Sequence, residues 1–205
     1  RFLALLGMGF LIAFALWQGY STYHHGYEAR QKDTRHAVEV AHGVLAWAHS
    51  LETSGQLTRD QAQGLARNAL MKLRYSEREY FWINDMAPTV IMHPIKPELN
   101  GKDASGIKDP NGLALFVAFA DKVRKEGEGF VPYLWPKPGQ DLPVEKISFV
   151  KGFSPWGWVV GSGIYLDDLR AEMVTYIQKL AAIATVALAV TVVLTLSITR
   201  SIVRG

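Results

Sequence analysis

The chain begins and ends with long apolar segments. Residues 2–17 and 180–198 contain no charged side chain, and both runs approach the length of a membrane-spanning helix, about 20 residues. The pattern predicts two transmembrane helices, over residues 1–17 and 180–198. A cleaved signal peptide is the alternative for the first segment. No Ala-x-Ala-type cleavage site follows Trp17, and Trp17, Tyr20 and Tyr23 are typical of an interfacial aromatic belt, so we favour a retained anchor.

Between these segments, apolar residues first recur with the spacing of helices. Steps of three and four residues predict a long amphipathic helix that ends near Ser54 and Gly55. Thr58 and Gln61 have the spacing of a capping box, so a second helix is expected to begin there. The apolar positions are Ala37, Val40, Ala41, Val44, Leu45, Ala48 and Leu51, then Ala62, Leu65, Ala66, Ala69, Leu70 and Leu73.

After Tyr75 the pattern changes to short aromatic and β-branched runs separated by Pro, Gly, Asn and Asp. These runs predict strands at residues 80–84, 89–93, 129–135, 144–151 and 158–164. Helices are expected at residues 113–125, with Asp109 or Asn111 as the cap, and at residues 165–179. This order of elements predicts an α+β domain over residues 18–179, with an antiparallel sheet packed on a helix.

Charge and composition exclude several functions. All 19 acidic residues and 19 of the 22 basic residues lie within residues 18–179, so the net charge of +3 arises at the termini and no nucleic-acid partner is expected. The absence of cysteine excludes disulfides, a thiol nucleophile and a Cys-ligated metal. His36, His42 and His49 are spaced too far apart on one helix to share a metal. We expect no catalytic residue, no metal and no cofactor.

Basic residues flank both apolar segments on the side away from the domain. Arg1 precedes the first segment, and Arg200 and Arg204 follow the second. The positive-inside rule therefore places both termini in the cytoplasm. The region between the two segments is then expected outside the membrane.

Four segments stand in order along about residues 30–170: LRYSEREYFWINDMAPTVIMHP, LNGKDASGIKDPNG, GFVPYLWPKPG and KISFVKGFSPWGWVVGSGIYLDD. They resemble the single Cache sensor domains of bacterial chemoreceptors and sensor kinases. The end of the chain, residues 199–205 within LSITRSIVRG, is similar to the entry of a HAMP helix. The resemblance implies a Cache (PAS-like) fold with two flanking transmembrane helices, in a methyl-accepting chemotaxis receptor or a related sensor. It also implies a homodimer in the bacterial inner membrane, with a periplasmic sensor domain and a cytoplasmic signalling domain or kinase complex downstream.

The residue types on the predicted strands favour a small organic acid as ligand. A cation neutralises a carboxylate, hydroxyl groups orient it, and aromatic walls limit its size. We expect polar contacts from Lys146, His93, Tyr80 and Tyr133, walls from Trp82, Trp135, Met92 and Phe149, and further contacts from Arg74 and Tyr75. In the family that the chain resembles, such pockets bind acetate, propionate, pyruvate or lactate, and the resemblance implies the same class here.

Each of these residues also has a purely structural explanation. Aromatic strand residues usually pack in a core, Lys146 could be a solvated surface cation, and His93 could bond the loop backbone. Gly161 and Gly163 allow close approach of a ligand or of a neighbouring aromatic ring. The alternative to a receptor is therefore a ligand-free periplasmic protein-binding or structural module. An enzyme acting on cell-envelope substrates has no supporting motif. The receptor hypothesis requires that the ligand displace the predicted helix at residues 165–179.

Overall fold

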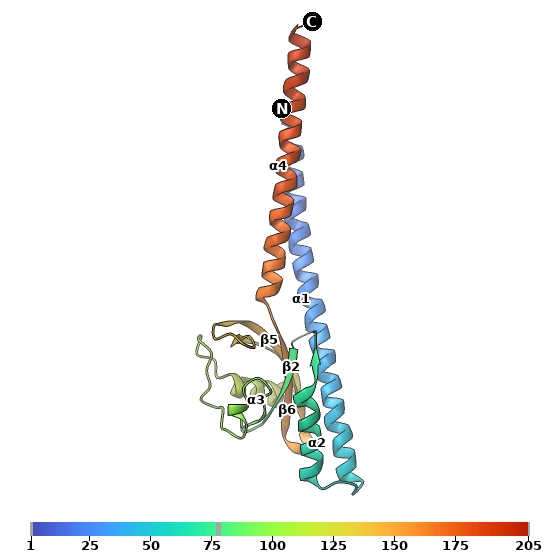
Figure 1. The fold of residues 1–205 in the computed structure, drawn as a ribbon, viewed down its shortest axis with the longest axis vertical. Coiled ribbons are helices and arrows are strands. Elements are labelled where there is room, and N and C mark those ends of the chain that lie inside the picture. The colour runs from blue at the N-terminus through green and yellow to red at the C-terminus, as the bar shows by residue number, and fades with distance from the viewer. Residues whose placement is uncertain (1, 77–78, 205) are drawn as a thin grey trace. The chain divides into compact units, whose positions relative to one another are not determined.

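The computed structural model describes residues 2–76 and 79–204, which form two compact units. The sheet unit is Glu28–Asp167 and contains all strands of the described residues. The helix unit is made of the residues up to Tyr27 and those from Asp168 onward. Figure 1 shows the elements of both, and each unit is described separately below.

The helix unit consists of parts of two long helices, α1 (Phe2–Thr53) and α4 (Asp167–Arg204). Neither helix contains proline, so neither hydrogen-bond ladder is interrupted. Among the described residues, one segment, Ala171–Val193, is long and apolar enough to cross a membrane. It overlaps the expected span at residues 180–198. The other expected span, residues 1–17, is helical from Phe2, but many of its side chains lie outside the described part, so that span stays a prediction.

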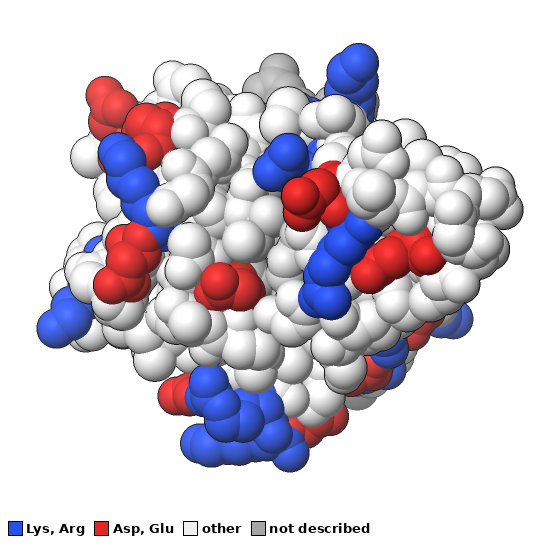
Figure 2. Space-filling model, turned by 90° about the horizontal axis from the view of Figure 1, so that it is seen from below, with Lys and Arg blue, Asp and Glu red and all other residues white. Residues whose placement is uncertain are grey.

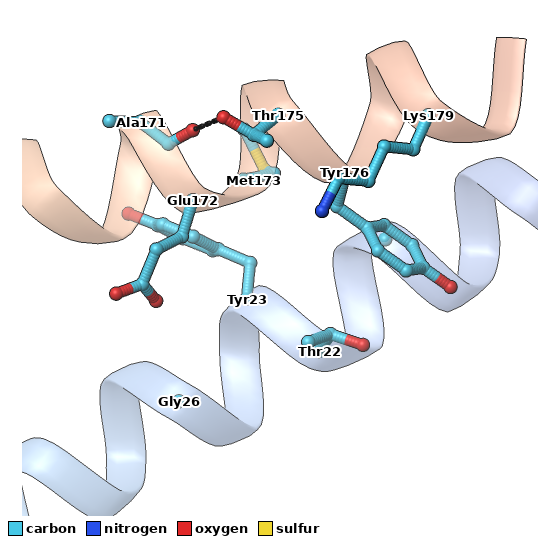
Figure 3. A pocket seen from close by; sticks show the side chains of 10 residues that line it. Thr22, Tyr23, Gly26, Ala171, Glu172, Met173, Thr175, Tyr176 and Lys179 are labelled. Atoms are coloured by element: carbon cyan, nitrogen blue, oxygen red, sulfur yellow. Dashed lines mark hydrogen bonds between the residues drawn. The ribbon is translucent and has the colours of Figure 1, made fainter. Parts of the chain in front are cut away.

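A glycine allows α1 and α4 to pack closely within the helix unit. A Cβ atom on Gly19 would lie 3.8 Å from the side chains of Tyr176 and Ile177. Beside Gly19 the two helices enclose a groove of about 580 Å³, to which Tyr23 and Lys179 contribute (Figure 3). The small residue therefore sets the distance between the helices at this level.

The sheet unit is built on an antiparallel sheet with the strand order β1-β2-β6-β5-β4, and β3 pairs with β2. The strands are β1 (Arg74–Tyr75), β2 (Glu79–Asp85), β3 (Val90–Met92), β4 (Glu128–Pro136), β5 (Pro143–Phe153) and β6 (Trp158–Tyr165). The remaining helices are α2 (Arg59–Lys72), α3 (Leu115–Glu126) and the 3₁₀ turns η1 (Pro97–Leu99) and η2 (Ser154–Trp156).

Each face of the sheet carries its own buried core. On one face, side chains of α1 and α2 such as Leu45 pack with Phe81 and Phe149. On the other face, side chains of α3 such as Phe119 pack with Trp82. Because successive strand residues point to opposite faces, neighbours in the sequence belong to different cores. The candidate site lies on the α3 face.

The predicted α+β architecture, with an antiparallel sheet and a long N-terminal helix, is confirmed. The predicted capping box is confirmed as well. The Thr58 hydroxyl accepts a hydrogen bond from the Gln61 backbone N–H, and the Gln61 side chain accepts one from the Thr58 N–H. These two bonds satisfy backbone groups at the start of α2 that have no partner within the helix.

Two local expectations are wrong. Tyr165, expected at the start of the last helix, is the final residue of β6, because it continues the pairing of β6 with β5. Asp109 and Asn111 do not cap α3, since its first turn follows Ala114, which forms no side-chain capping bond. The carboxylate of Asp109 instead accepts hydrogen bonds from the N–H groups of Asn111 and Leu113, so it closes the polar loop before α3.

Charged side chains are interspersed over the face that Figure 2 shows, apart from a small basic group at its lower edge. Within the sheet unit, several charged side chains form ion pairs with side chains of the opposite sign. Glu128 pairs with both Arg35 and Lys151, and Lys122 pairs with Glu126. The face shown therefore carries no extended basic stripe of the kind that binds a nucleic-acid backbone.

Candidate ligand-binding site

A row of three polar side chains crosses the sheet on the face that carries α3. Lys146 on β5 pairs with Tyr133 on β4 and with Tyr165 on β6, so the three side chains lie side by side. Tyr80 on β2 reaches the same lysine through its hydroxyl group. Lys146, Tyr133 and Tyr80 are site residues expected from the sequence, and the structure brings them together.

Lys146 is a buried cation, with 1% of its surface exposed. Its Nζ atom donates hydrogen bonds to the hydroxyl oxygens of Tyr80, at 3.1 Å, and Tyr165, at 3.4 Å. The same atom lies 4.3 Å and 4.5 Å from the centroids of these two rings. Within the described residues, no carboxylate forms an ion pair with it. An ammonium group removed from water carries a large desolvation cost, which a carboxylate in direct contact with it would offset.

His93 contributes a second hydrogen-bond donor beside the lysine. Its Nδ1 atom accepts hydrogen bonds from the backbone N–H groups of Ile95 and Lys96, at 3.3 Å and 3.0 Å. Burial, with the nearby charges of Lys146 and Lys96, lowers the pKa of His93 to about 3. The ring is therefore neutral at physiological pH, and because Nδ1 is an acceptor, the proton is assigned to Nε2. The ring centroid lies 5.2 Å from that of Tyr80, so His93 stands next to the Lys146 cluster.

Aromatic side chains surround these polar groups. Trp135 lies beside both His93 and Tyr133, with ring centroids 6.1 Å and 6.4 Å apart, and Lys96 places its Nζ atom 4.9 Å from the centroid of the Trp135 ring. Phe119 of α3 packs against Tyr133 at 5.2 Å. The Tyr133 hydroxyl pairs with Ser148 Oγ at 2.9 Å, and burial raises the pKa of Tyr133 well above its usual value. The arrangement thus combines a polar centre with apolar walls, as small-molecule sites usually do.

Two glycines of β6 form the floor of this cluster. A Cβ atom on Gly161 would lie between 2.4 Å and 2.9 Å from three ring atoms of Trp82. On Gly163 it would lie 1.9 Å from Ser148 Oγ. Glycine at these positions lets the Trp82 ring and the Ser148 side chain rest directly on the sheet. The sequence offered two explanations for these glycines, close approach of a ligand or of an aromatic ring. For Gly161 the structure shows the aromatic ring, that of Trp82.

The structure does not bring Arg74, Tyr75, Met92 and Phe149 to the Lys146 cluster. Arg74 is exposed and donates to backbone carbonyls at the end of α2. Tyr75 bonds Ser162 Oγ at 2.8 Å, and burial raises its pKa to about 12. Met92 and Phe149 belong to the core that faces α1 and α2. For Phe149 the physical reason is alternation, since it is an odd number of residues from Lys146 on the same strand.

Residues 27–179 match the model of a protein family described as single Cache domain 2. The chain belongs to this family. The resemblance recognised in the four sequence segments is therefore confirmed.

Relatives and solved structures agree with this assignment. The methyl-accepting chemotaxis protein McpP of Pseudomonas putida is 44% identical over 183 residues, which are 88% of this chain and 34% of McpP. A structure titled as the periplasmic sensor domain of a chemotaxis protein is 50% identical, with a TM-score of 0.67, and covers 68% of this chain and 97% of its own. A structure titled for carboxylic acid recognition by a Cache chemosensory domain is 47% identical, with a TM-score of 0.67, and covers 70% and 97%. The chain thus spans about a third of the length of McpP.

Sequence reasoning missed three residues that shape the site of this Cache domain. Tyr165 bonds the central lysine, Asn100 accepts a hydrogen bond from the His93 N–H at 2.7 Å, and Asp109 accepts one from the Leu134 N–H at 3.1 Å. A signal for Tyr165 was present in the sequence, since continued alternation from Gly161 and Gly163 places it on their face. The contact of Asp109 joins a loop to the distant strand β4, and the contact of Asn100 closes a loop on His93 seven residues earlier. The spacing of residue types carries no signal for either contact.

Proposed function

We propose that this chain is the sensory part of a transmembrane receptor that binds a short-chain carboxylate outside the cytoplasm and relays its presence to a cytoplasmic output. The observation that carries the proposal is the buried ammonium of Lys146, hydrogen-bonded only to the hydroxyls of Tyr80 and Tyr165 among the described residues. A carboxylate placed there would receive charge-assisted hydrogen bonds, which are stronger than those to hydroxyl groups. Carboxylic acid recognition by the 47% identical Cache domain supports this ligand class.

The charges of the site favour a monocarboxylate. Lys146 supplies one buried positive charge, and the low pKa of His93 keeps that ring a neutral donor. A second carboxylate beside Trp135 would meet Lys96, but this lysine is half-buried and remains partly solvated, so it offsets the desolvation cost less than the buried Lys146 does. The charges thus favour one carboxylate group, and acetate, propionate, pyruvate and lactate are the monocarboxylates that the family resemblance implies.

We also propose a membrane topology for the chain. Residues 1–17 and 180–198 would be the two spans, residues 199–205 the start of a HAMP-like linker, and residues 18–179 the periplasmic domain. The apolar segment Ala171–Val193 and the basic residues near both termini support this arrangement. We further propose a homodimer in a bacterial inner membrane, coupled to a chemotaxis or kinase output, as the name of McpP suggests for a related protein.

A binding experiment tests the ligand class directly. The chain, purified in detergent, is screened by thermal shift against acetate, propionate, pyruvate, lactate, dicarboxylates and amines. A ligand at 100 times its Kd stabilises the folded state by about 2.7 kcal/mol, so selective stabilisation by monocarboxylates is expected. Stabilisation by amines or dicarboxylates alone would contradict the site chemistry. Absence of any shift at millimolar concentrations would favour a ligand-free protein-binding module.

Calorimetry with a matched pair of variants then tests the role of Lys146. Lys146→Met is expected to weaken propionate binding by about 1.5–3 kcal/mol, the typical contribution of a hydrogen bond to a charged group. Lys151→Met removes a lysine of the same strand that pairs with Glu128 instead, and should leave the affinity unchanged. Equal affinities for Lys146→Met and the unaltered chain would exclude Lys146 as the anion contact.

A further inference from the structure

The hydroxyl group of Tyr165 is shared between the candidate ligand site and the backbone of β4. It accepts the hydrogen bond from Lys146 Nζ at 3.4 Å and donates one to the carbonyl oxygen of Pro136 at 3.0 Å. The Tyr165 ring also lies beside two ammonium groups. Lys146 Nζ is 4.5 Å from its centroid and Lys137 Nζ is 5.6 Å away. Any movement of Lys146 therefore changes the surroundings of Tyr165.

Tyr165 is the last residue of β6, and α4 begins two residues later at Asp167. Two contacts fasten this junction to the β4–β5 hairpin. The Leu166 N–H donates to the Glu145 carbonyl oxygen at 2.9 Å, and Lys137 Nζ pairs with Asp167 Oδ2 at 2.8 Å. The other oxygen of Asp167, Oδ1, is buried and has no hydrogen-bond partner among the described residues. The junction is therefore held to the hairpin by one backbone hydrogen bond and one ion pair of a partly exposed carboxylate.

We infer that Tyr165 is a positioning residue that couples occupancy of the Lys146 site to the junction where α4 begins. This inference rests on the proposed function and adds to it the residue through which the bound state is communicated. A carboxylate attracts Lys146 Nζ more strongly than a hydroxyl does, so the ligand draws Nζ away from the long bond to Tyr165. The Tyr165 hydroxyl then loses the charged donor that polarises it, so its own hydrogen bond to the Pro136 carbonyl weakens. Pro136 immediately precedes Lys137, so the strand end that holds Asp167 through Lys137 is fastened less firmly, and the junction opens more often.

Hydrogen exchange at the junction measures this coupling. The full chain in lipid nanodiscs is exchanged with and without saturating sodium propionate, and the exchange rate of the Leu166 amide is followed. Propionate is expected to speed exchange at Leu166 about threefold or more, because local opening governs the exchange of a hydrogen-bonded amide. In Tyr165→Phe the amide should exchange fast without propionate and respond little to it. The propionate Kd of this variant should change less than about tenfold, since Lys146 keeps its bond to Tyr80 and no group placed on the ligand is removed.

Two control experiments separate the proposed coupling from nonspecific destabilisation of the fold. Tyr75→Phe removes a tyrosine hydroxyl bond of similar length on the other face of the sheet, and should keep the full propionate response at Leu166. Lys137→Gln breaks the pair with Asp167 and should speed exchange at Leu166, whereas Lys122→Gln, which breaks an ion pair on α3, should not. The lysine pair tests the junction even if Tyr165→Phe does not fold.

The outcomes distinguish this inference from the function on which it rests. Measured propionate binding without any change at Leu166 overturns the coupling and leaves the proposed function intact. A full propionate response in Tyr165→Phe also overturns the coupling. Failure of the unaltered chain to bind propionate or any other short carboxylate overturns the proposed function, and the inference with it.

Discussion

The Nζ atom of Lys146 lies 3.1 Å from the hydroxyl oxygen of Tyr80 and 4.3 Å from the centroid of the same ring. One tyrosine thus offers the buried ammonium both a hydrogen-bond acceptor and the negative face of its π system. This combination stabilises the cation without neutralising it. The positive charge therefore remains available for an anion, whereas a carboxylate in place of Tyr80 would have cancelled it.

The first prediction concerns this tyrosine. Tyr80→Phe keeps the ring beneath Lys146 and removes the hydroxyl, which would donate its proton to a bound carboxylate. Propionate binding should weaken by about 1.5–3 kcal/mol, roughly 12- to 160-fold, as measured by calorimetry. The ring packing stays in place, so the loss of unfolding free energy, which comes from the missing acceptor of Lys146, should be no larger than the loss of affinity. A loss of stability larger than the loss of affinity would mean that the hydroxyl serves the fold.

The elements of the fold were predictable because their signals are local. The apolar spacing around Leu45 and the capping box at Thr58 depend only on residues within a few positions, and both features occur as expected. The end of β6 at Tyr165 was not predicted correctly. There the pairing with β5 holds the residue in the sheet, which is a contact between segments separated in sequence.

The candidate site was predictable where strand alternation alone decides the direction of a side chain. Tyr80 and Trp82 share one face, and the structure places both in the core beside α3. Phe149 was assigned to the site wrongly. It lies an odd number of residues from Lys146, so strand alternation places it on the opposite face, but its aromatic side chain suggested a wall of the site. The position of His93 depends on hydrogen bonds from the loop backbone, which only the folded chain reveals.

The second prediction tests the glycine floor. In Gly161→Ala the added methyl group would lie 2.4 Å from the nearest Trp82 ring atom, so the ring must move. Such overpacking should reduce the free energy of unfolding by about 1–3 kcal/mol and alter the tryptophan fluorescence. Gly64→Ala is the control, since a Cβ there meets nothing within 4 Å and the residue lies inside α2. That change should stabilise the chain by about 0.5–1 kcal/mol, and equal effects of the two variants would contradict the packing argument.

The third prediction is a pH dependence of stability. The pKa of His93 falls from 6.5 to about 3 on folding, chiefly through burial and then through the charges of Lys146 and Lys96. Below pH 6.5 the unfolded chain binds a proton on this ring that the folded chain excludes until about pH 3. Stability should therefore be complete above this window and fall as the pH decreases through it, with a contribution of up to about 1.4 kcal/mol per pH unit.

Variants isolate the contribution of His93 from that of the carboxylates, which also titrate at low pH. His93→Gln should show a shallower loss of unfolding free energy between pH 6 and pH 4 than the unaltered chain, measured by chemical denaturation at each pH. His42→Gln should flatten the profile less, because this ring is half-buried, although burial lowers its pKa in the same direction. Parallel profiles for His93→Gln and the unaltered chain would show that the ring is protonated in the folded state.

The last prediction concerns the loop that carries the partners of His93. The carboxylate of Asp109 is buried and accepts three backbone hydrogen bonds, from Asn111 and Leu113 within the loop and from Leu134 on β4. Asp109→Asn replaces one accepting oxygen with a donor, which leaves at least one buried N–H without a partner. The free energy of unfolding should fall by about 1–3 kcal/mol, and amide exchange at Leu134 should quicken.

Asp103→Asn is the control for this change. Asp103 is an exposed loop aspartate that accepts a bond from the Ser105 N–H, so the variant should have little effect on either measurement. Because the loop holds Nδ1 of His93, Asp109→Asn should also weaken propionate binding, and an unchanged Kd would show that the loop anchor and the ligand site are independent.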